Sequence, residues 1–516
     1  MSISSVTKSS SDAASVIDRS DLRFESLKRG HNLRFPATDA EAASRIIVCS
    51  SGDETAAALQ RVVSSGLRPT VRSGGHCYED FVANNPNGAI LDLSTLNMVD
   101  ADPSGAFRIA PGAVLGEAYQ VLFKRYGVTL PAGTCYMVGA GGHISGGGYG
   151  LLSRLHGLTC DWITAIDILT VDAQGKVENR RVDAEHDADL FRACRGAGGG
   201  NFGVITNFHF DRLPPAPGEV AEAGVSFSWA DMNVEKFTRI LVSFGDYWAT
   251  RGLKPDTWGL FSILSLSPAN SPTARFGIHA QFVNPDGTAS DVSVLREFLD
   301  RFAQFEPDEI SSDGPNATAL PHDSKTSSPY YRINRRPWLS ATIAEGGSGG
   351  GSRAKYKSAY MKQTFTPAEC AAIYKYLAAS KTKAGGVFLA VDSYGGAINR
   401  SERIPDTAIA QRSSIMKLQW QSYWRAERED AEHLKFMDDF FTAVYTGPHV
   451  PEAYQGTPFG DRFEGCYMNY ADADMLRYSH WPQLYYGTGS LYPFLQQVKR
   501  RYDPNNIFHS SMSIRA

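Results

Sequence analysis

Two glycine-rich stretches carry the residues that could do chemistry. The segment 131–150 reads Pro-Ala-Gly-Thr-Cys-Tyr-Met-Val-Gly-Ala-Gly-Gly-His-Ile-Ser-Gly-Gly-Gly-Tyr-Gly and holds Cys135 and His143. An Arg-Ser-Gly-Gly-His run at 72–76 ends on His76. Glycine is costly inside helices and strands, but its main-chain N–H groups can line a concave surface for an anion. These stretches therefore predict a site for a phosphate-bearing cofactor.

The spacing excludes the commonest nucleotide fingerprints. The chain has no Gly-x-x-x-x-Gly-Lys-[Ser/Thr] loop, and a Gly-x-Gly-x-x-Gly motif starting at Gly139 fails because Ile144 stands in its sixth place. The seven cysteines are odd in number and include no Cys-x-x-Cys pair, so they indicate neither a disulfide framework nor a zinc site. No metal is expected.

Both stretches resemble the berberine bridge enzyme-like flavoproteins, which share the fold of p-cresol methylhydroxylase and vanillyl-alcohol oxidase. In that family the histidine of Arg-Ser-Gly-Gly-His is bonded to the 8α-methyl group of FAD, and the cysteine of Gly-x-Cys-x-x-Val-Gly to C6 of the same ring. Here these places hold His76 and Cys135. The resemblance implies covalent FAD, 8α-histidyl through His76 and 6-S-cysteinyl through Cys135, which would fix the ring and raise its reduction potential.

Further motifs extend the resemblance over residues 30–516. The glycine-rich segment 195–206 resembles a family segment along the flavin diphosphate, and the chain closes on Tyr-Met-Asn-Tyr, Tyr-Tyr-Gly and Tyr-Asp-Pro-Asn-Asn-Ile-Phe. His143 stands where the family places a histidine near N1–C2=O, a position that would stabilise reduced flavin. The cofactor-binding residues predicted in this way are His76, Cys135, Arg72, Ser73, Gly74, Gly75, Val138, Gly139, Gly142, His143, Gly146, Gly147, Gly150, Gly200, Asn201, Val204, Tyr467 and Asn469.

A flavin oxidase also needs a base that removes a proton from its substrate. The resemblance makes Tyr470, the second tyrosine of Tyr-Met-Asn-Tyr, that base. Strand alternation places Asp392 and Tyr394 on one face, so either could assist it in the substrate cleft. Lowering the pKa of a phenol from about 10 by roughly three units requires about 4 kcal/mol from a positive or hydrogen-bonding partner.

The resemblance predicts an oxidase. Family members with valine at the place of Val138 tend to react with dioxygen, and Gln419 and Gln421 lie on a segment like the family's substrate strand. The leading hypothesis is hydride transfer from an alcohol or hemiacetal carbon of a sugar or glycosylated natural product to FAD, with dioxygen reduced to hydrogen peroxide. The alternatives are oxidative cyclisation or C–H oxidation of a secondary metabolite, and a covalent flavoprotein that sequesters a drug-like ligand.

The composition limits the other partners. With 51 basic and 55 acidic residues, the net charge is −4 and no basic cluster stands out, so nucleic acid is not expected. No window approaches 18 apolar residues, which argues against a membrane span. The first twenty residues lack a secretory or twin-arginine signal. We expect a cytoplasmic monomer or homodimer, although a mature secreted form without its signal would look similar.

The predicted secondary-structure elements change in length and pattern at Pro214-Pro-Ala-Pro217. Short strands and helices precede this linker, whereas long alternating segments separated by helical patterns follow it, which is typical of an antiparallel sheet backed by helices. A Gly/Ser run within 344–353 is interpreted as a surface loop or lid hinge. The predicted fold is α+β: a flexible leader (1–30), an FAD-binding domain of the p-cresol methylhydroxylase type (31–215), a substrate domain (216–455), and a C-terminal segment (456–516) that returns to the FAD-binding domain.

Overall fold

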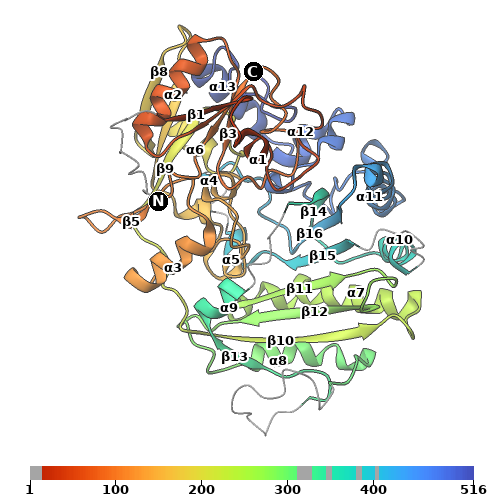
Figure 1. Ribbon diagram of the computed structural model, residues 1–516. Helices are drawn as coiled ribbons and strands as arrows, with labels where there is room; N and C mark the ends of the chain where they lie inside the picture. The colour runs from red at the N-terminus through yellow and green to blue at the C-terminus, as the bar shows by residue number, and fades with distance from the viewer. Residues whose placement is uncertain (1–13, 311–327, 345–350, 379–385, 401, 403–405) are drawn as a thin grey trace, which may run out of the picture.

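Three β-sheets organise the chain (Figure 1). The computed structural model describes residues 14–310, 328–344, 351–378, 386–400, 402 and 406–516. A four-stranded sheet has the order β1-β2-β4-β3, a five-stranded sheet the order β5-β6-β9-β7-β8, and a seven-stranded sheet the order β13-β10-β12-β11-β15-β16-β14. The two smaller sheets share one lobe with the C-terminal helices, and the large sheet builds the other (Figure 1). The predicted α+β fold class is confirmed.

The four-stranded sheet delivers His76. Strands β2 (Arg45–Val48) and β3 (Pro69–Arg72) run parallel to β4 (Ala89–Asp92), and helix α2 (Gly52–Ser64) connects β2 to β3. The Ser51 side chain caps α2 by accepting a hydrogen bond from the Glu54 N–H. The His76 loop follows the carboxyl end of β3.

The described part of the predicted leader is ordered, which corrects that prediction. Strand β1 (Ser15–Asp18) pairs antiparallel with β2, and helix α1 (Phe24–Leu27) follows it. Ile17 and Phe24 are buried in a small apolar cluster with Ile46 and Ile90. The burial of these two apolar side chains holds β1 against β2, so that β1 covers what would otherwise be an exposed edge of β2. Residues 1–13 lie outside the described residues.

The five-stranded sheet and its helices carry the second glycine-rich stretch. Helix α3 ends at Gly127, whose φ of +68° is a left-handed conformation that suits glycine. The loop with Cys135 follows, and α4 carries His143. The elements are β5 (Val99–Ala101), β6 (Phe107–Ile109), α3 (Leu115–Tyr126), α4 (Ala140–Ser145), α5 (Ser153–His156), β7 (Ala165–Val171), β8 (Val177–Asp183), α6 (Ala188–Cys194) and β9 (Val204–Phe210).

The seven-stranded sheet is antiparallel throughout, and one of its faces is covered by helices. Trp420 packs against Phe440 and Phe441 of helix α11, whereas Gln419 and Gln421 point the other way because side chains alternate along a strand. The elements are β10 (Glu219–Ser228), α7 (Val234–Ala249), β11 (Leu260–Leu266), β12 (Arg275–Phe282), α8 (Ser293–Asp300), β13 (Asn334–Pro337), α9 (Trp338–Ala344), β14 (Arg353–Met361), α10 (Pro367–Ala378), β15 (Val387–Ser393), β16 (Met416–Trp424) and α11 (Asp430–Val444).

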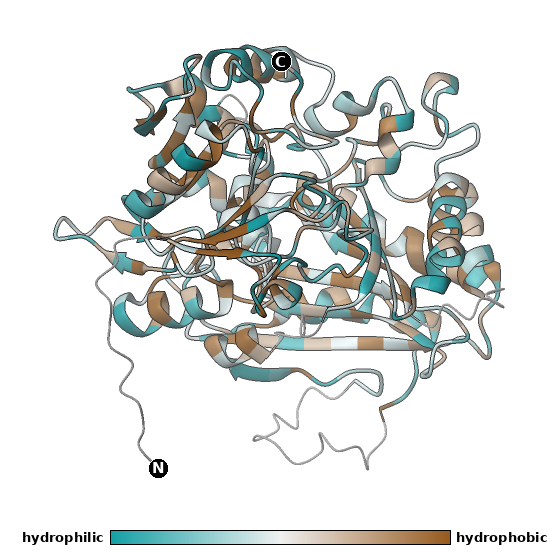
Figure 2. Ribbon diagram, turned by 45° about the horizontal axis from the view of Figure 1, so that its top comes forward, coloured by the Kyte–Doolittle hydropathy of each residue, from teal (hydrophilic) through white to brown (hydrophobic). Residues whose placement is uncertain are grey.

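The C-terminal segment packs onto the first lobe. Helices α12 (Trp481–Tyr486) and α13 (Leu491–Tyr502) lie beside the smaller sheets in Figure 1. Tyr502 donates to Asp189, and Lys499 donates to the Asn201 carbonyl at 2.7 Å, so α13 holds the glycine-rich loop before β9. Apolar residues concentrate on strands and inner helix faces (Figure 2), and one continuous core joins the five- and seven-stranded sheets.

Membrane-spanning helices, metal-ligand clusters and the Gly/Ser run were also considered in the sequence. No helix in the described ranges is long and apolar enough to cross a membrane, and no group of three or more potential metal ligands occurs among these residues. Most of the Gly/Ser run interpreted as a hinge lies outside the described residues. The domain boundaries at 215 and 455 stay predictions.

Candidate active site

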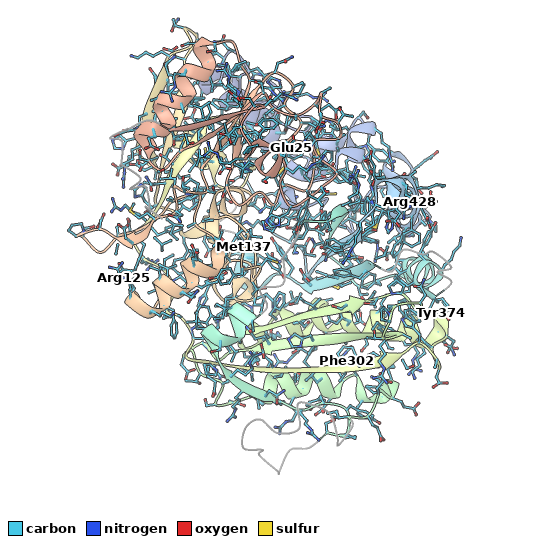
Figure 3. All side chains as sticks on the ribbon, viewed as in Figure 1. Glu25, Arg125, Met137, Phe302, Tyr374 and Arg428 are labelled. Carbon is cyan, nitrogen blue, oxygen red and sulfur yellow. The ribbon has the colours of Figure 1, made fainter. Side chains whose placement is uncertain are left out.

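A cavity of about 500 Å³ lies between the two lobes. The loops that carry His76 and Cys135, the glycine-rich loop 198–201 and the C-terminal residues 508–513 line one side. Strands β11, β15 and β16 line the other. Met137, near the middle of Figure 3, is exposed at the junction of the lobes. The cavity therefore brings together segments that are hundreds of residues apart in the chain.

His76 has a buried nitrogen with nothing to bond. Its Nε2 has no hydrogen-bond partner in the described part of the chain. The ring stacks on His31 with 3.6 Å between centroids, and burial, followed by His31, lowers the pKa of His76 to about 3. His76 is therefore neutral near neutral pH, and an unsatisfied buried nitrogen on a residue that lines a cavity requires an explanation. A covalently attached cofactor would supply one.

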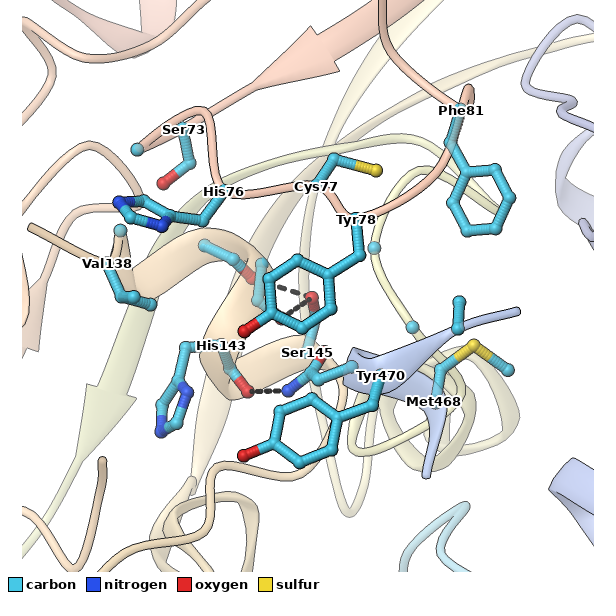
Figure 4. Close-up of a pocket in the computed structure, with 18 of the residues that line it drawn as sticks. Ser73, His76, Cys77, Tyr78, Phe81, Val138, His143, Ser145, Met468 and Tyr470 are labelled. Carbon is cyan, nitrogen blue, oxygen red and sulfur yellow. Dashed lines mark hydrogen bonds between the residues drawn. The ribbon is translucent and has the colours of Figure 1, made fainter. Parts of the chain in front are cut away.

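The His76 and Cys135 loops touch backbone to backbone. A Cβ on Gly74 would collide with the Gly139 nitrogen, and a Cβ on Gly139 would collide with Gly74 in return. Only glycine at both positions lets the loops meet this closely. Cys135 and Val138 line the same cavity as His76. Figure 4 shows Val138 near the His76 ring. The two predicted anchors thus face one space from separate loops.

His143 has a defined tautomer. Its Nε2 accepts a hydrogen bond from the Gly133 N–H at 3.0 Å, so neutral His143 carries its proton on Nδ1. Burial, followed by the charge of Lys417, lowers the pKa of His143 to about 4. His143 is therefore a neutral hydrogen-bond donor near neutral pH.

Most of the predicted cofactor residues line the cavity. Gly142 and Gly200 expose their backbone to open space, since a Cβ on either would meet no atom within 4 Å. Such bare main chain is suited to a phosphate or a flat ring. The predicted residues that line the cavity are His76, Cys135, Arg72, Ser73, Gly74, Gly75, Val138, Gly139, Gly142, His143, Gly150, Gly200, Asn201, Tyr467 and Asn469.

Three predicted cofactor residues do not line the cavity. A Cβ on Gly146 would collide with the Asn469 amide, and one on Gly147 would press on Ile409, so these glycines serve close packing. Val204 is fully buried in an apolar cluster. Helix α4 ends at Ser145, so the chain turns into the protein interior after that residue.

Tyr470 lies beside a lysine that the sequence analysis missed. The Lys417 ammonium donates to the Tyr470 hydroxyl at 3.3 Å and lies 4.4 Å from its ring centroid. Lys417 is fully buried and forms an ion pair with Asp392 at 2.7 Å. In the strand register Asp392 is paired with Lys417, and Lys417 precedes Gln419 by two residues on one face of β16. Strand alternation backwards from Gln419 could have found it.

The phenol of Tyr470 is protonated in this environment. Burial, followed by the Asp392 charge, raises the pKa of Tyr470 well above its ordinary value. Lys417 is the cation that can offset this shift when a proton must leave.

Tyr394 is not placed with them. Strand β15 ends at Ser393, and Gly395 has a φ of +88°, so strand alternation stops before residue 394. The Tyr394 hydroxyl donates to the Gln411 carbonyl at 3.0 Å, and the side chain is buried away from the cavity. The expectation that Tyr394 faces the substrate cleft is therefore corrected, whereas Asp392 does line it.

The wall opposite the glycine loops is half polar and half apolar. Gln419 and Gln421 of β16 line it on one side, and Phe261 and Ile263 of β11 on the other. Tyr78, two residues after His76, stacks on Tyr356 of β14 with ring centroids 3.6 Å apart and faces Tyr470 (Figure 4). This wall suits a ligand with both hydroxyl groups and apolar surface.

A buried charge network fixes the segments that carry Tyr78 and Tyr470. Lys355 binds Glu79 at 2.7 Å and Asp472 at 2.6 Å, and Lys357 binds Asp472 at 2.8 Å and Asp474 at 2.7 Å. Both lysines belong to the edge strand β14. The His76 loop and the Tyr470 segment are therefore both held by one strand.

Comparisons with known proteins agree with this geometry. The FAD binding domain family matches residues 43–179, and the berberine and berberine-like family matches residues 466–515. The aclacinomycin-N/aclacinomycin-A oxidase of Streptomyces galilaeus is 33% identical over 97% of this chain and 89% of its own. The chain belongs to the berberine bridge enzyme-like family. It is an FAD-linked oxidoreductase.

Other family members are similar along their whole length. The hexose oxidase of Chondrus crispus is 32% identical over 96% of this chain and 94% of its own. The crystal structure of the oxidoreductase that catalyses the terminal step of gilvocarcin biosynthesis superposes with a TM-score of 0.86 at 29% identity, covering 97% of this chain and all of that one. The berberine bridge enzyme-like protein described here is thus an FAD-dependent oxidase.

Proposed function

We propose that this berberine bridge enzyme-like protein oxidises an alcohol or hemiacetal carbon of a sugar or glycosylated natural product. The cluster of Tyr470, Lys417 and Asp392, which faces the two candidate anchors across one cavity, carries this proposal. The names of the aclacinomycin oxidase and of the hexose oxidase support a carbohydrate-bearing substrate.

His76 and Cys135 would hold FAD at two points. His76, whose Nε2 is unpartnered, and the exposed Cys135 line the same cavity, and both side chains could bond to the edge of a flat ring. When bound, FAD accepts the hydride and passes its electrons to dioxygen, which gives hydrogen peroxide. Val138, on the same loop as Cys135, would leave room for dioxygen.

Tyr470 would accept the substrate's hydroxyl proton. The Lys417 ammonium, 3.3 Å from the phenol oxygen, stabilises the phenolate form. The Asp392 carboxylate destabilises the phenolate and offsets part of the effect of the Lys417 charge. The opposed lysine and aspartate set the pKa of the base. His143, as a neutral donor with its proton on Nδ1, would hold negative charge that develops on the cofactor side.

One experiment tests the proposal directly. The purified protein is mixed anaerobically with sugars and with polyketide glycosides while the yellow absorbance is followed. Bleaching by a sugar or glycoside is the expected result, and peroxide should form when air is admitted. A spectral shift without bleaching would instead favour ligand sequestration, and bleaching only by hydroxyl-free metabolites would favour oxidative cyclisation.

Two proposals concern the setting of the enzyme. We retain a cytoplasmic location and a monomeric or homodimeric state, together with an FAD-binding domain at 31–215 completed by residues 456–516. Subcellular fractionation and analytical ultracentrifugation would test the first two.

A further inference from the structure

The amide of Gln421 is held by one end only. Gln421 lines the cavity although its side chain is only 9% exposed. Its Oε1 accepts a hydrogen bond from the Tyr423 hydroxyl at 2.7 Å. In the described ranges no hydrogen bond involves its Nε2. A nine-tenths buried amide that lines a cavity with two unused donors is prepared for a ligand.

Tyr423 is rigidly placed to hold that amide. Its ring meets Tyr356 edge-on at 5.6 Å and stacks on Phe388 at 6.1 Å. Tyr356 and Phe388 are also the residues paired with Gln421 on the two neighbouring strands. Tyr423 itself does not line the cavity, so any effect that it has on a ligand acts through Gln421.

The hydrogen bonds allow one orientation of the amide. A hydrogen bond joins the Tyr356 and Tyr423 hydroxyls, and burial, followed by Tyr78, raises the pKa of Tyr356. The single proton of the Tyr423 hydroxyl is donated to Gln421. Tyr423 therefore accepts from Tyr356 and donates to Gln421. If the amide turned over, both hydroxyl protons would have to reverse, and the Tyr356 proton would lose Tyr423 as its acceptor. The carbonyl thus stays on Tyr423, and the NH2 group stays on the cavity.

We propose that Tyr423 is a specificity-determining positioning residue that locks Gln421 as a hydrogen-bond donor. The group recognised is an acceptor oxygen, such as a hydroxyl, ether or ring oxygen, that neighbours the carbon being oxidised. This inference rests on the proposed function and narrows its substrate to a polyoxygenated ring. An ammonium at this position is rejected because it would meet N–H donors on the strand that also carries Lys417.

The test compares Tyr423→Phe with the unchanged enzyme on D-glucose, its 2-, 3-, 4- and 6-deoxy derivatives, and the phenyl β-glucosides of the same series. Anaerobic flavin bleaching gives an apparent dissociation constant and a limiting rate for each probe. In the unchanged enzyme one deoxy position should cost the most affinity. In Tyr423→Phe that cost should shrink by about 5- to 10-fold, with the limiting rate within about twofold, because one net hydrogen bond is lost.

The controls separate this role from general packing. Tyr374, on helix α10, donates its hydroxyl proton to the Met232 carbonyl at 3.0 Å. Tyr374→Phe removes this comparable hydrogen bond and should leave the order of affinities among the deoxy probes unchanged. Gln421→Glu keeps an acceptor for Tyr423 but has no N–H donors, and should lose the same selectivity even if Tyr423→Phe folds poorly.

The possible failures are distinct. Bleaching with the same deoxy pattern in Tyr423→Phe and Gln421→Glu would overturn this inference and leave the proposed function intact. If no probe in the series and no polyketide glycoside bleached the unchanged enzyme, the proposed function would fall and this inference with it.

Discussion

The two sides of the cavity are built by different means. The cofactor side consists of backbone, in which Gly74 and Gly139 let two loops meet and Gly142 and Gly200 present bare main chain. The substrate side consists of side chains on three antiparallel strands, such as Phe261, Asp392 and Gln421. Backbone surfaces bind what is common to every turnover, whereas side chains can be exchanged without disturbing the fold. We therefore expect the substrate specificity of this enzyme to be set by the sheet.

The largest expected effect is loss of covalently attached flavin from the cofactor side. In the double variant His76→Ala, Cys135→Ala no flavin should remain with acid-precipitated protein, because both proposed bonds are gone. Each single variant should retain flavin, since one bond suffices. The measurement is the flavin absorbance of the washed pellet, and release of flavin from either single variant would contradict a second attachment.

The next effect belongs to the substrate side alone. Tyr470→Phe should slow anaerobic bleaching by about 100- to 10,000-fold, the usual contribution of a general base, while flavin content stays normal. Stopped-flow absorbance with the best probe gives the rate. An unchanged rate would assign proton removal to another group.

The contrast between the two sides also governs what the sequence could predict. The glycine motifs identified the cofactor side because such loops are contiguous in the chain and few backbones can replace them. His76, Cys135 and His143 do line one cavity, and their roles toward FAD stay predictions. Lys417 was missed because its role depends on Asp392 and Tyr470, which are brought to it by strand register and by a distant segment.

Tyr394 shows the opposite error. Periodicity placed it beside Asp392, but the strand ends one residue too early, and strand ends are set by packing that a single sequence does not display. Strand β1 was missed for the same reason, because it is stabilised by its pairing with the edge of β2, a contact that a single sequence does not display.

A moderate effect concerns pH. Because burial and then Asp392 raise the pKa of Tyr470, the phenolate fraction, and with it the bleaching rate, should increase as pH rises. Asp392→Asn removes the opposing charge and should move this rise to lower pH by about 1 to 3 units, and Lys417→Met should move it to higher pH by a similar amount. Shifts of the same sign in both variants would refute the opposed roles.

The smallest effect tests the correction to Tyr394. Tyr394→Phe should change the bleaching rate by less than about twofold, because its hydroxyl is bonded to Gln411 inside the protein. It should still lower the free energy of unfolding by about 1 kcal/mol, since the Gln411 carbonyl loses a buried partner. Thermal denaturation of the holoprotein and stopped-flow bleaching measure the two quantities.

The charge network on β14 has a consequence for folding during synthesis of the chain. Lys355 and Lys357 lie on an edge strand, and two of their four carboxylate partners, Asp472 and Asp474, come late in the chain. Until Asp472 and Asp474 have been synthesised, only Glu79 can pair with Lys355 and only Asp438 with Lys357, so burying both ammonium groups would cost several kcal/mol. The second lobe is thus unable to mature ahead of the chain terminus, so a prematurely terminated polypeptide would be left without a finished catalytic wall.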